Sequence, residues 1–474
     1  MQTQPSPPST PAVQTQSRPQ LQTNPATADR HESLLPRRRF LRQLGGSLLA
    51  APFVTRGLMA DSPNGKLRHA SFGAAGMATG DINAIINHGG VELVAVADVD
   101  SRAFARIKQA HPDVRCFQDW REMMAEMGDQ IDSVNVSTPD HMHGVQVMSA
   151  LERGIHVYDQ KPLAQNIAEC RALTLKARET GVINQMGIQL SSTFNERLVA
   201  ALVEAGAIGK VKEVHTFSDK KWGDPNPRPD RSDDLPAELD WDGWLGVASE
   251  RTFINNYYHP GNWRRRRDFG TGTLGDMGCH IFSSWFRALK LTSPDSIRSD
   301  GDTPNDYNWA NNLRVEYIFP ATEVTEGDQV KVVWYDGDQR PPQEVAALIE
   351  GALPGQGSVL IGTEGVMLAP HASSPRLFPA EKFRGYQYPR LEPRNHYGEF
   401  VDACRSGNGE QPSANFEYSG PLTEIVLLGC IASAFPGETM QWNPQAMTVD
   451  HEDANKLMRR DYRDGWQIEG FPAT

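Results

Sequence analysis

The hydrophobic pattern of the chain changes character near residue 190. Before that point, short β-rich runs alternate with longer stretches whose apolar positions recur at helical spacing. Five runs have strand character: LRHASFGA, VELVAVADVD, IDSVNVSTP, GIHVYDQ and GVINQMGIQ. Strand–helix alternation predicts parallel βαβ units, and hence a doubly wound parallel sheet over residues 66–188.

After residue 190, strand-like runs follow one another with loops between them. They are KVKEVHTFSDK, NNLRVEYIFP, VKVVWYD and SVLIGTEGVMLAP. This order predicts a second α/β domain over residues 189–445, with a large, mostly antiparallel, open-faced sheet. Two late stretches of helical periodicity, NHYGEFVDACRSG and SGPLTEIVLLGCIASAF, are expected to pack on one face of it. Residues 446–474 are expected to form a C-terminal tail.

The N-terminal 60 residues differ from the rest. Residues 1–30 are rich in Pro, Gln, Ser and Thr, a composition typical of disorder. The following PRRRFLRQLGGSLLAAPFVTRGLMA resembles a twin-arginine export signal; the alternative is a basic disordered tail. Its apolar run is too short and broken to span a bilayer stably. We expect a disordered tail and export signal at 1–60, and a periplasmic or other extracytoplasmic location reached through the twin-arginine machinery.

Composition narrows the function classes. The chain has 474 residues, 39% hydrophobic and 22% charged, with net charge −12. This size suits two domains with substantial cores, and the acidity argues against binding to nucleic acid or an anionic membrane surface. The five cysteines form no CxxC pair, which indicates buried thiols. We expect no metal site.

A glycine-containing turn, FGAAGMATGD, follows the first predicted strand. A dinucleotide-binding turn needs small residues at its first, third and sixth positions, here Gly73, Ala75 and Ala78. Gly76 and Met77 lie in the same turn. With two glycines of the pattern replaced by alanine, the turn alone is a weak indication of dinucleotide binding.

The second strand supports this interpretation, because Asp98 stands where an acidic residue binds the adenosine ribose. A carboxylate there repels a 2′-phosphate and favours NAD, although Ser101 and Arg102 leave NADP open. The carboxyl end of the fourth strand is expected to line the cofactor crevice. The residues expected there are Ser137, Thr138, Pro139 and His143, with His143 expected to cap the next helix or support the pocket rather than to do chemistry.

Three further residues are candidates for proton transfer. Asp276 and His280 are four positions apart, which stacks them on one helix face. A metal pair is the weaker interpretation because two ligands are too few, and the flanking small and apolar residues argue against a solvated face. Lys161 closes the strand VYDQKPLA. It is either solvated, or partly desolvated beside the nicotinamide with a pKa lowered toward neutrality.

Four motifs together resemble the glucose–fructose oxidoreductase / inositol 2-dehydrogenase (Gfo/Idh/MocA) family: DQKP, TPDHMHG, YYHPGNWR and GTGTLGDMGCHIF. The resemblance covers residues 66–444. It implies a Rossmann domain that binds NAD, then an α/β domain whose open sheet makes homodimers or tetramers. It also implies a role for each residue. Lys161 anchors the substrate hydroxyl and acts as acid or base. His280 shares the proton with the reacting oxygen, and Asp276 orients the substrate or the imidazole. The usual Glu-Lys-Pro is Gln160-Lys161-Pro162 here, and whether Asp159 compensates is open.

The resemblance places the loop NNYYHPGNWRRRRDFG near the substrate. Aromatic rings with polar tips suit sugars, although the same rings also suit a core. The candidate substrate-binding residues are Tyr258, His259, Trp263 and Arg264, with Trp222 as part of a lid. The arginine run 264–267 is either a salt-bridged surface or a grip for an anionic group such as a uronate.

These features predict an exported NAD(P)-dependent oxidoreductase. It would transfer hydride between the nicotinamide and a hydroxyl of a sugar, sugar acid or cyclitol. Because an exported enzyme has no free NAD pool, the cofactor is expected to be tightly bound. Two alternatives stay open: an NAD-dependent glycoside hydrolase that uses transient oxidation and elimination, and a non-catalytic nucleotide or sugar sensor.

Overall fold

The computed structural model describes residues 65–468 and 470–471. The expected tail and export signal at 1–60 lie outside these residues. Within the described range, none of the helices combines the length and the apolar character needed to cross a bilayer.

The N-terminal part is a six-stranded parallel sheet with strand order β3-β2-β1-β4-β5-β6. Its strands are β1 (Leu67–Phe72), β2 (Val91–Ala97), β3 (Arg115–Phe117), β4 (Ser133–Val136), β5 (His156–Asp159) and β6 (Asn184–Met186). Its helices are α2 (Met77–Asn87), α3 (Phe104–Ala110), α4 (Trp120–Met127), α5 (Asp140–Glu152) and α6 (Ile167–Thr180). The predicted Rossmann sheet is confirmed. The strand order reverses between β1 and β4, where such sheets bind ligands.

Local sequence explains these elements. Every residue of β4 and β5 is buried, as expected where helices cover both faces of a parallel sheet. Helix α6 begins after Asn166, whose side chain accepts a hydrogen bond from the Glu169 N–H. It ends at Gly181, whose φ of 66° is the left-handed conformation that glycine adopts without strain.

The second sheet has nine strands in the order β13-β12-β11-β7-β10-β9-β8-β14-β15. All neighbouring strands are antiparallel except the parallel pair β7 and β10, so the mostly antiparallel prediction is confirmed. The strands are β7 (Val211–Ser218), β8 (Ser296–Gly301), β9 (Leu313–Pro320), β10 (Gln329–Asp336), β11 (Gln356–Gly362), β12 (Val366–Pro370), β13 (Arg376–Phe378), β14 (Thr439–Asn443) and β15 (Thr448–Val449).

The segment expected as a C-terminal tail contributes to this domain. It contains β15 and a short helix, α13 (Glu452–Asn455). Ala454, Met458 and Trp466 are buried in the main hydrophobic core. Burial of these side chains holds residues 446–466 against the rest of the domain.

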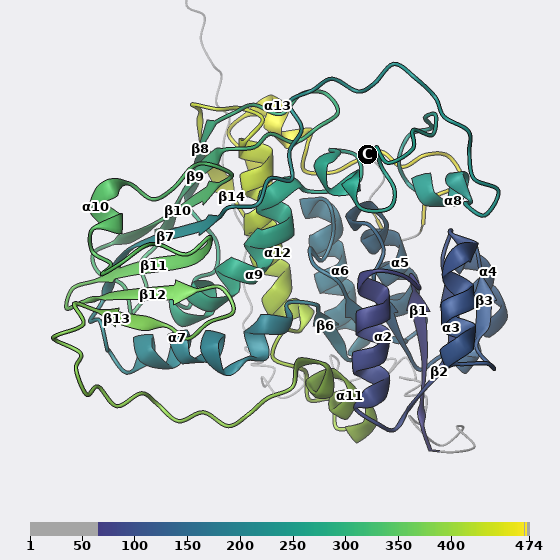
Figure 1. Cartoon of the computed structure of the whole chain (residues 1–474), viewed down its shortest axis with the longest axis horizontal. Coiled ribbons are helices and arrows are strands. Elements are labelled where there is room, and N and C mark those ends of the chain that lie inside the picture. The colour runs from purple at the N-terminus through teal and green to yellow at the C-terminus, as the bar shows by residue number, and fades with distance from the viewer. Residues whose placement is uncertain (1–64, 469, 472–474) are drawn as a thin grey trace, which may run out of the picture. The chain divides into compact units, whose positions relative to one another are not determined.

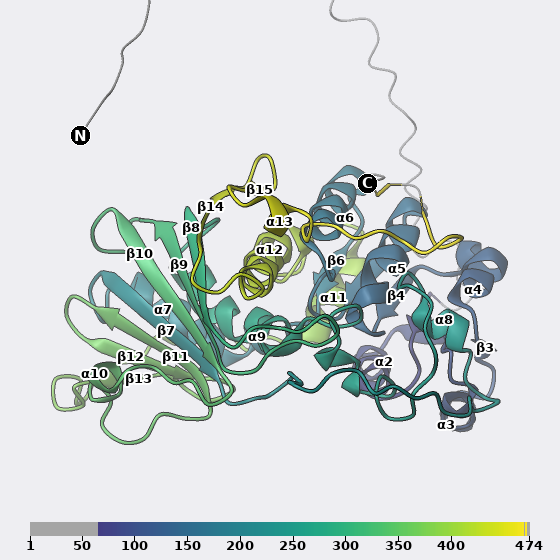
Figure 2. The same ribbon diagram turned by 90° about the horizontal axis from the view of Figure 1, so that it is seen from above.

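Helices α7 (Phe194–Glu204), α9 (Gly272–Ala288) and α12 (Phe416–Ala432) complete the layers. Figures 1 and 2 show α9 and α12 between the nine-stranded sheet and the Rossmann helices. Almost every residue of α9 is buried, so its polar residues face protein interior or a cavity. The remaining helices are α8 (Trp241–Leu245), α10 (Gln343–Ala346) and α11 (His396–Ser406).

Candidate active site

A cavity of about 1070 Å³ runs from the turn after β1 to helix α9. Its lining comes from the Rossmann domain, from the loop around residue 260 and from the second domain. Most residues proposed from the sequence line it: Gly73, Ala75, Gly76, Met77, Asp98, Ser137, Thr138, Pro139, Lys161, His259, Trp263, Arg264, Asp276 and His280. The fold therefore brings the nucleotide-binding and proton-transfer candidates into one space.

Two proposed contact residues do not line the cavity. His143 is buried, with its ring nitrogens 2.8 Å from the Pro162 carbonyl oxygen and 2.9 Å from the Thr138 carbonyl oxygen. It supports the backbone of Thr138 instead of meeting the cofactor. Tyr258 is buried in an aromatic cluster, and its hydroxyl accepts a hydrogen bond from Arg228. Neither side chain lines the cavity, and the hydrogen bonds of His143 fit the supporting role expected for it.

The turn after β1 has the backbone that close approach of a pyrophosphate requires. Gly73 has φ of 98°, and a Cβ there would lie 2.9 Å from the Ser137 carbonyl oxygen. A side chain would therefore clash as well as strain the backbone. Gly76, with φ of 57°, directly precedes helix α2. Small residues and a helix N-terminus together fit a dinucleotide pyrophosphate.

Backbone N–H groups of nearby residues hold the side chain of Asp98 just after β2. One carboxylate oxygen accepts a hydrogen bond from the Ala74 N–H at 2.8 Å, and the other accepts one from the Asp100 N–H at 3.0 Å. Burial raises the pKa of Asp98, and these two hydrogen bonds oppose the rise. The carboxylate is thereby fixed where a ribose diol would meet it.

The neighbouring Asp100, which was not predicted from the sequence, also lines the cavity. Its carboxylate pairs with Arg102 and lies 3.2 Å from His259 Nε2. Arg102 is thus engaged by a carboxylate at the position where a 2′-phosphate would need it. Two carboxylates at this end fit NAD better than NADP.

At the other end, an ion pair joins the two domains. The Lys161 ammonium, after β5, donates to Asp276 Oδ1 at 2.6 Å and to the Asp276 carbonyl oxygen at 2.7 Å. Arg264 Nε lies 3.2 Å from the same carboxylate, and Lys220 Nζ lies 3.7 Å from its other oxygen. Burial alone would raise the pKa of Asp276, but Lys161 and Arg264 hold it well below its usual range.

His280 lies one helical turn beyond Asp276 and lines the cavity. Burial and the Lys161 ammonium lower its pKa well below 6.5, so the imidazole is neutral. Its Nδ1 is buried and has no hydrogen-bond partner among the described residues. The ring of His371 lies 5.9 Å away, and burial lowers the pKa of His371 to about 4. The site therefore combines the Lys161 side chain, a hydrogen-bond donor, with a neutral imidazole that can accept a proton.

Asp159 does not take the place of the missing Glu-Lys-Pro carboxylate. It is fully buried, its carboxylate has no hydrogen-bond partner in the described part of the chain, and its nearest ion-pair contact is His143 at 3.6 Å. The Gln160 amide faces Asp81, with Nε2 at 3.0 Å from both carboxylate oxygens. Asp276 is the carboxylate that meets Lys161.

The arginine run separates into different environments. Arg264 lines the cavity, with its guanidinium 4.3 Å from the centre of the Trp263 ring and 5.7 Å from that of Trp222. Arg266 is buried and pairs with Asp224 at 2.7 Å. Of the four arginines, Arg264 is the one that can meet a substrate in this cavity.

Lys220, Gln356 and His371 also line the substrate end, and none of them was predicted from the sequence. They lie at the end of β7, at the start of β11 and just after β12. Gln356 and His371 stand alone among residues of another kind, and Lys220 is one of two consecutive lysines, so no local spacing marks any of the three. Pairing of β11 with both β7 and β12 brings these three ends together.

A parallel six-stranded sheet, a small-residue turn and a fixed carboxylate at the end of β2 define a dinucleotide-binding protein. Residues 67–188 match the oxidoreductase family, NAD-binding Rossmann fold, and residues 210–468 match the C-terminal alpha/beta domain of the same family. The chain belongs to the Gfo/Idh/MocA oxidoreductase family.

Individual relatives are distant. Levoglucosan dehydrogenase of Pseudarthrobacter phenanthrenivorans is 24% identical over 165 residues, which cover 34% of each chain. The 2,7-anhydro-N-acetylneuraminate hydratase of Mediterraneibacter gnavus is 31% identical over 88 residues, which cover 19% of this chain and 24% of that protein. The matches thus span 34% and 24% of these two relatives. The WlbA dehydrogenase of Bordetella pertussis, solved with NADH and UDP-GlcNAcA, shares the fold at a TM-score of 0.56 and 17% identity, covering 80% of this chain and 99% of that one.

Proposed function

We propose that the protein is an NAD-dependent oxidoreductase that acts on a CH–OH group of a sugar, sugar acid or cyclitol. One observation carries the proposal. The Lys161–Asp276 ion pair and the neutral His280 share a cavity with the dinucleotide turn and Asp98. Hydride transfer from a carbinol needs a proton acceptor at the reacting oxygen and a cofactor beside the carbon.

The bound nicotinamide supplies the hydride acceptor or donor. Lys161 donates a hydrogen bond to the reacting hydroxyl and holds it in place. Asp276 holds the Lys161 side chain in place through their hydrogen bond, and the lowered pKa of Asp276 prevents it from taking the proton at neutral pH. The neutral His280 imidazole is then the group that accepts the hydroxyl proton.

The substrate end is suited to a polyol with an anionic substituent. Trp222 and Trp263 offer ring faces, and Arg264 lies against both rings. Three cationic side chains surround the single carboxylate of Asp276, so the group as a whole carries a net positive charge. Asp140, whose carboxylate accepts a hydrogen bond from Thr271, offsets part of this surplus. A sugar acid would place its carboxylate on Arg264, which binds carboxylates through a planar fork.

The first experiment denatures the purified full-length protein and identifies any released dinucleotide. Added NAD and a panel of neutral sugars, uronates and cyclitols are then screened by nicotinamide absorbance. Turnover that His280→Gln lowers at least a hundredfold is expected, on the scale of general base catalysis. No dinucleotide binding and no turnover would contradict the proposal. Equal rates with neutral and acidic sugars would contradict only the preference for a sugar acid.

A redox-neutral elimination or hydration is the second candidate, because one relative is named a hydratase. The same Lys161 and His280 could move protons beside a transiently oxidised carbon. Product formed with no net change in nicotinamide absorbance would favour this reaction. A Lys161→Ala variant with unchanged biological activity would instead favour a non-catalytic sensor.

We also propose that residues 1–60 direct twin-arginine export and that the cofactor stays bound after export. The consecutive arginines 37–39 and the following apolar run support this proposal. A fusion of residues 1–60 to a folded reporter should reach the periplasm, and replacing the arginines with lysine should stop it. Light scattering of the purified protein tests the expected homodimer or tetramer.

A further inference from the structure

Helix α2 carries a buried carboxylate that takes no part in the proton transfer described above. Asp81 lies in the second turn of α2 and is fully buried. It accepts hydrogen bonds from the Ser137 hydroxyl at 2.7 Å and the Tyr397 hydroxyl at 2.8 Å, and Gln160 Nε2 lies 3.0 Å from both of its oxygens. Among the described residues, no cationic side chain pairs with it. Neutral donors alone therefore compensate the burial of this charge.

Two of these three donors line the catalytic cavity, whereas Asp81 itself does not. Ser137 follows β4, and Gln160 follows β5 and directly precedes Lys161. Helix α2 begins at the small-residue turn that fits a pyrophosphate. Asp81 thus ties together three elements that meet at the cavity: α2 and the carboxyl ends of β4 and β5.

The charge of Asp81 decides which way the Gln160 amide turns. A carboxylate can only accept hydrogen bonds, and burial raises the pKa of Asp81 to about 6, so the group is ionised at pH 8. Gln160 therefore turns Nε2 toward Asp81, and its Oε1 has no hydrogen-bond partner among the described residues. Gly187 leaves the amide little room, because a Cβ there would lie 2.8 Å from Nε2 and 3.0 Å from Oε1.

We propose that Asp81 is a positioning residue of the active site. It holds the Gln160 amide so that an acceptor oxygen, and not an N–H group, is offered to a ligand beside Lys161, and it ties Ser137 to α2. The inference rests on the proposed function, because it takes the dinucleotide and the hydroxyl substrate as the occupants of this cavity. Asp81 acts through Gln160 and Ser137 and touches neither occupant.

The test exchanges the two side-chain groups in the full-length protein at pH 8. Asp81→Asn lets the Gln160 amide turn either way, and Gln160→Glu sets two carboxylates against each other. We expect each single variant to weaken NAD binding in a fluorescence titration, and to lower kcat/KM, by about tenfold or more. The double variant Asp81→Asn/Gln160→Glu places an amide on α2 and turns an acceptor toward the cavity again. It should recover about tenfold over the worse single variant.

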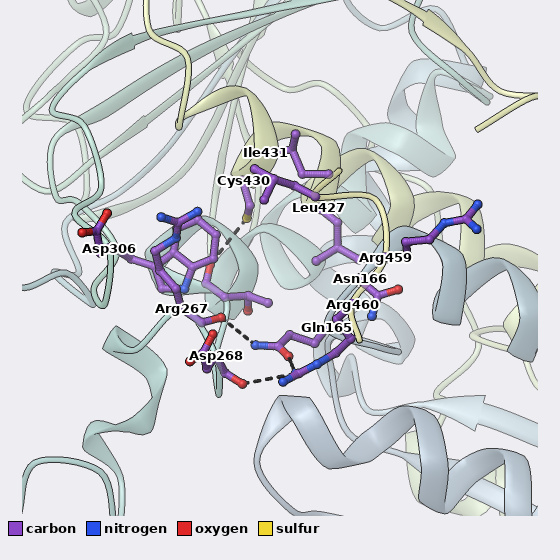
Figure 3. A pocket seen from close by; sticks show the side chains of 13 residues that line it. Gln165, Asn166, Arg267, Asp268, Asp306, Leu427, Cys430, Ile431, Arg459 and Arg460 are labelled. Atoms are coloured by element: carbon purple, nitrogen blue, oxygen red, sulfur yellow. Dashed lines mark hydrogen bonds between the residues drawn. The ribbon is translucent and has the colours of Figure 1, made fainter. Parts of the chain in front are cut away.

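Each single variant has a matched control. Asp336→Asn removes another buried carboxylate that neutral donors hold, from the Leu313 N–H at 2.9 Å and Trp334 Nε1 at 3.0 Å. Burial raises the pKa of Asp336 to about 7, and the residue does not line the catalytic cavity. Gln165→Glu changes a glutamine that faces Arg460 in a separate cavity of about 270 Å³ (Figure 3). Both controls should keep the NAD affinity and kcat/KM of the wild type.

Three results would overturn the inference and leave the proposed function standing. One is an Asp81→Asn variant with the NAD affinity and kcat/KM of an active wild type. Another is a double variant no better than the worse single variant. The third is an equal loss in Asp336→Asn, which would trace the effect to general destabilisation. A wild type that neither binds NAD nor turns over would overturn both proposals.

Thermal unfolding shows whether each variant is folded at the assay temperature. If Asp81→Asn does not fold, Gln160→Glu is compared with the double variant, whose recovery of folding and NAD binding would support the pairing. A double variant that also fails to fold would overturn it.

Discussion

Replacing Asp276 with asparagine tests the electrostatic centre of the site. The amide keeps the size and shape of the side chain but removes the charge that three cations share. Lys161 would lose its only ion-pair partner within the described ranges, and Arg264 and Lys220 would lose theirs. Their mutual repulsion would then be opposed by Asp140, which is attracted to Lys161 and Arg264 but pairs directly with neither.

The magnitude follows from distance and burial. At 2.6 Å and an effective dielectric of about 20, a charge pair attracts by roughly 6 kcal/mol before desolvation is subtracted. Lys161 and Asp276 are only 13% and 9% exposed, so removing one partner should cost about 3–5 kcal/mol of unfolding free energy. The matched control is Asp338→Asn, which breaks an ion pair whose members are 49% and 76% exposed and should cost under about 1 kcal/mol.

Urea unfolding of the wild type and both variants at pH 7 measures the difference. The folded-state pKa of Asp276 lies below that of the unfolded chain. Its contribution to stability is therefore fully present above the unfolded pKa of about 3.9 and is lost as the pH falls through the folded value. The gap between wild type and Asp276→Asn should be constant from pH 5 to pH 8. A loss no larger than that of Asp338→Asn would refute the reasoning.

Three further predictions concern single side chains. His280→Gln should lower kcat by about 10²–10⁴. The kcat/KM of the wild type should not fall near pH 6.5, because the lowered pKa of His280 keeps the imidazole neutral there. A fall in wild-type kcat/KM at that pH that the variant abolishes would contradict this. Asp98→Asn should weaken NAD binding about tenfold or more in a fluorescence titration, since hydrogen bonds to charged groups contribute about 1.5–3 kcal/mol. It should also reduce the preference for NAD over NADP. Unchanged NAD affinity would show that Asp98 does not bind the ribose. Burial raises the pKa of Glu196 from 4.5 to about 8, so the wild type should lose stability as the pH rises through this interval. In Glu196→Gln the urea midpoint should fall less between pH 5 and pH 8 than in the wild type. Parallel pH profiles of the two proteins would contradict this.

The sequence by itself determined the features that depend on near neighbours. The alternation of strands and helices predicted the Rossmann sheet, because burial on both faces leaves a local hydrophobic pattern. The small residues around Gly73 and the carboxylate of Asp98 mark the nucleotide end, since turn geometry is set within a few residues. The four-residue spacing of Asp276 and His280 predicted a shared helix face, and both line one cavity.

Only the tertiary structure decided which distant groups meet. The pairing of Lys161 with Asp276, rather than with Asp159, depends on how α9 packs between the two domains. Arg264 and Arg267 are three residues apart but line different cavities. Such outcomes follow from contacts across many tens of residues, for which the chain carries no periodic pattern. The packing of α9 therefore places the acid–base groups, and local sequence only supplies them.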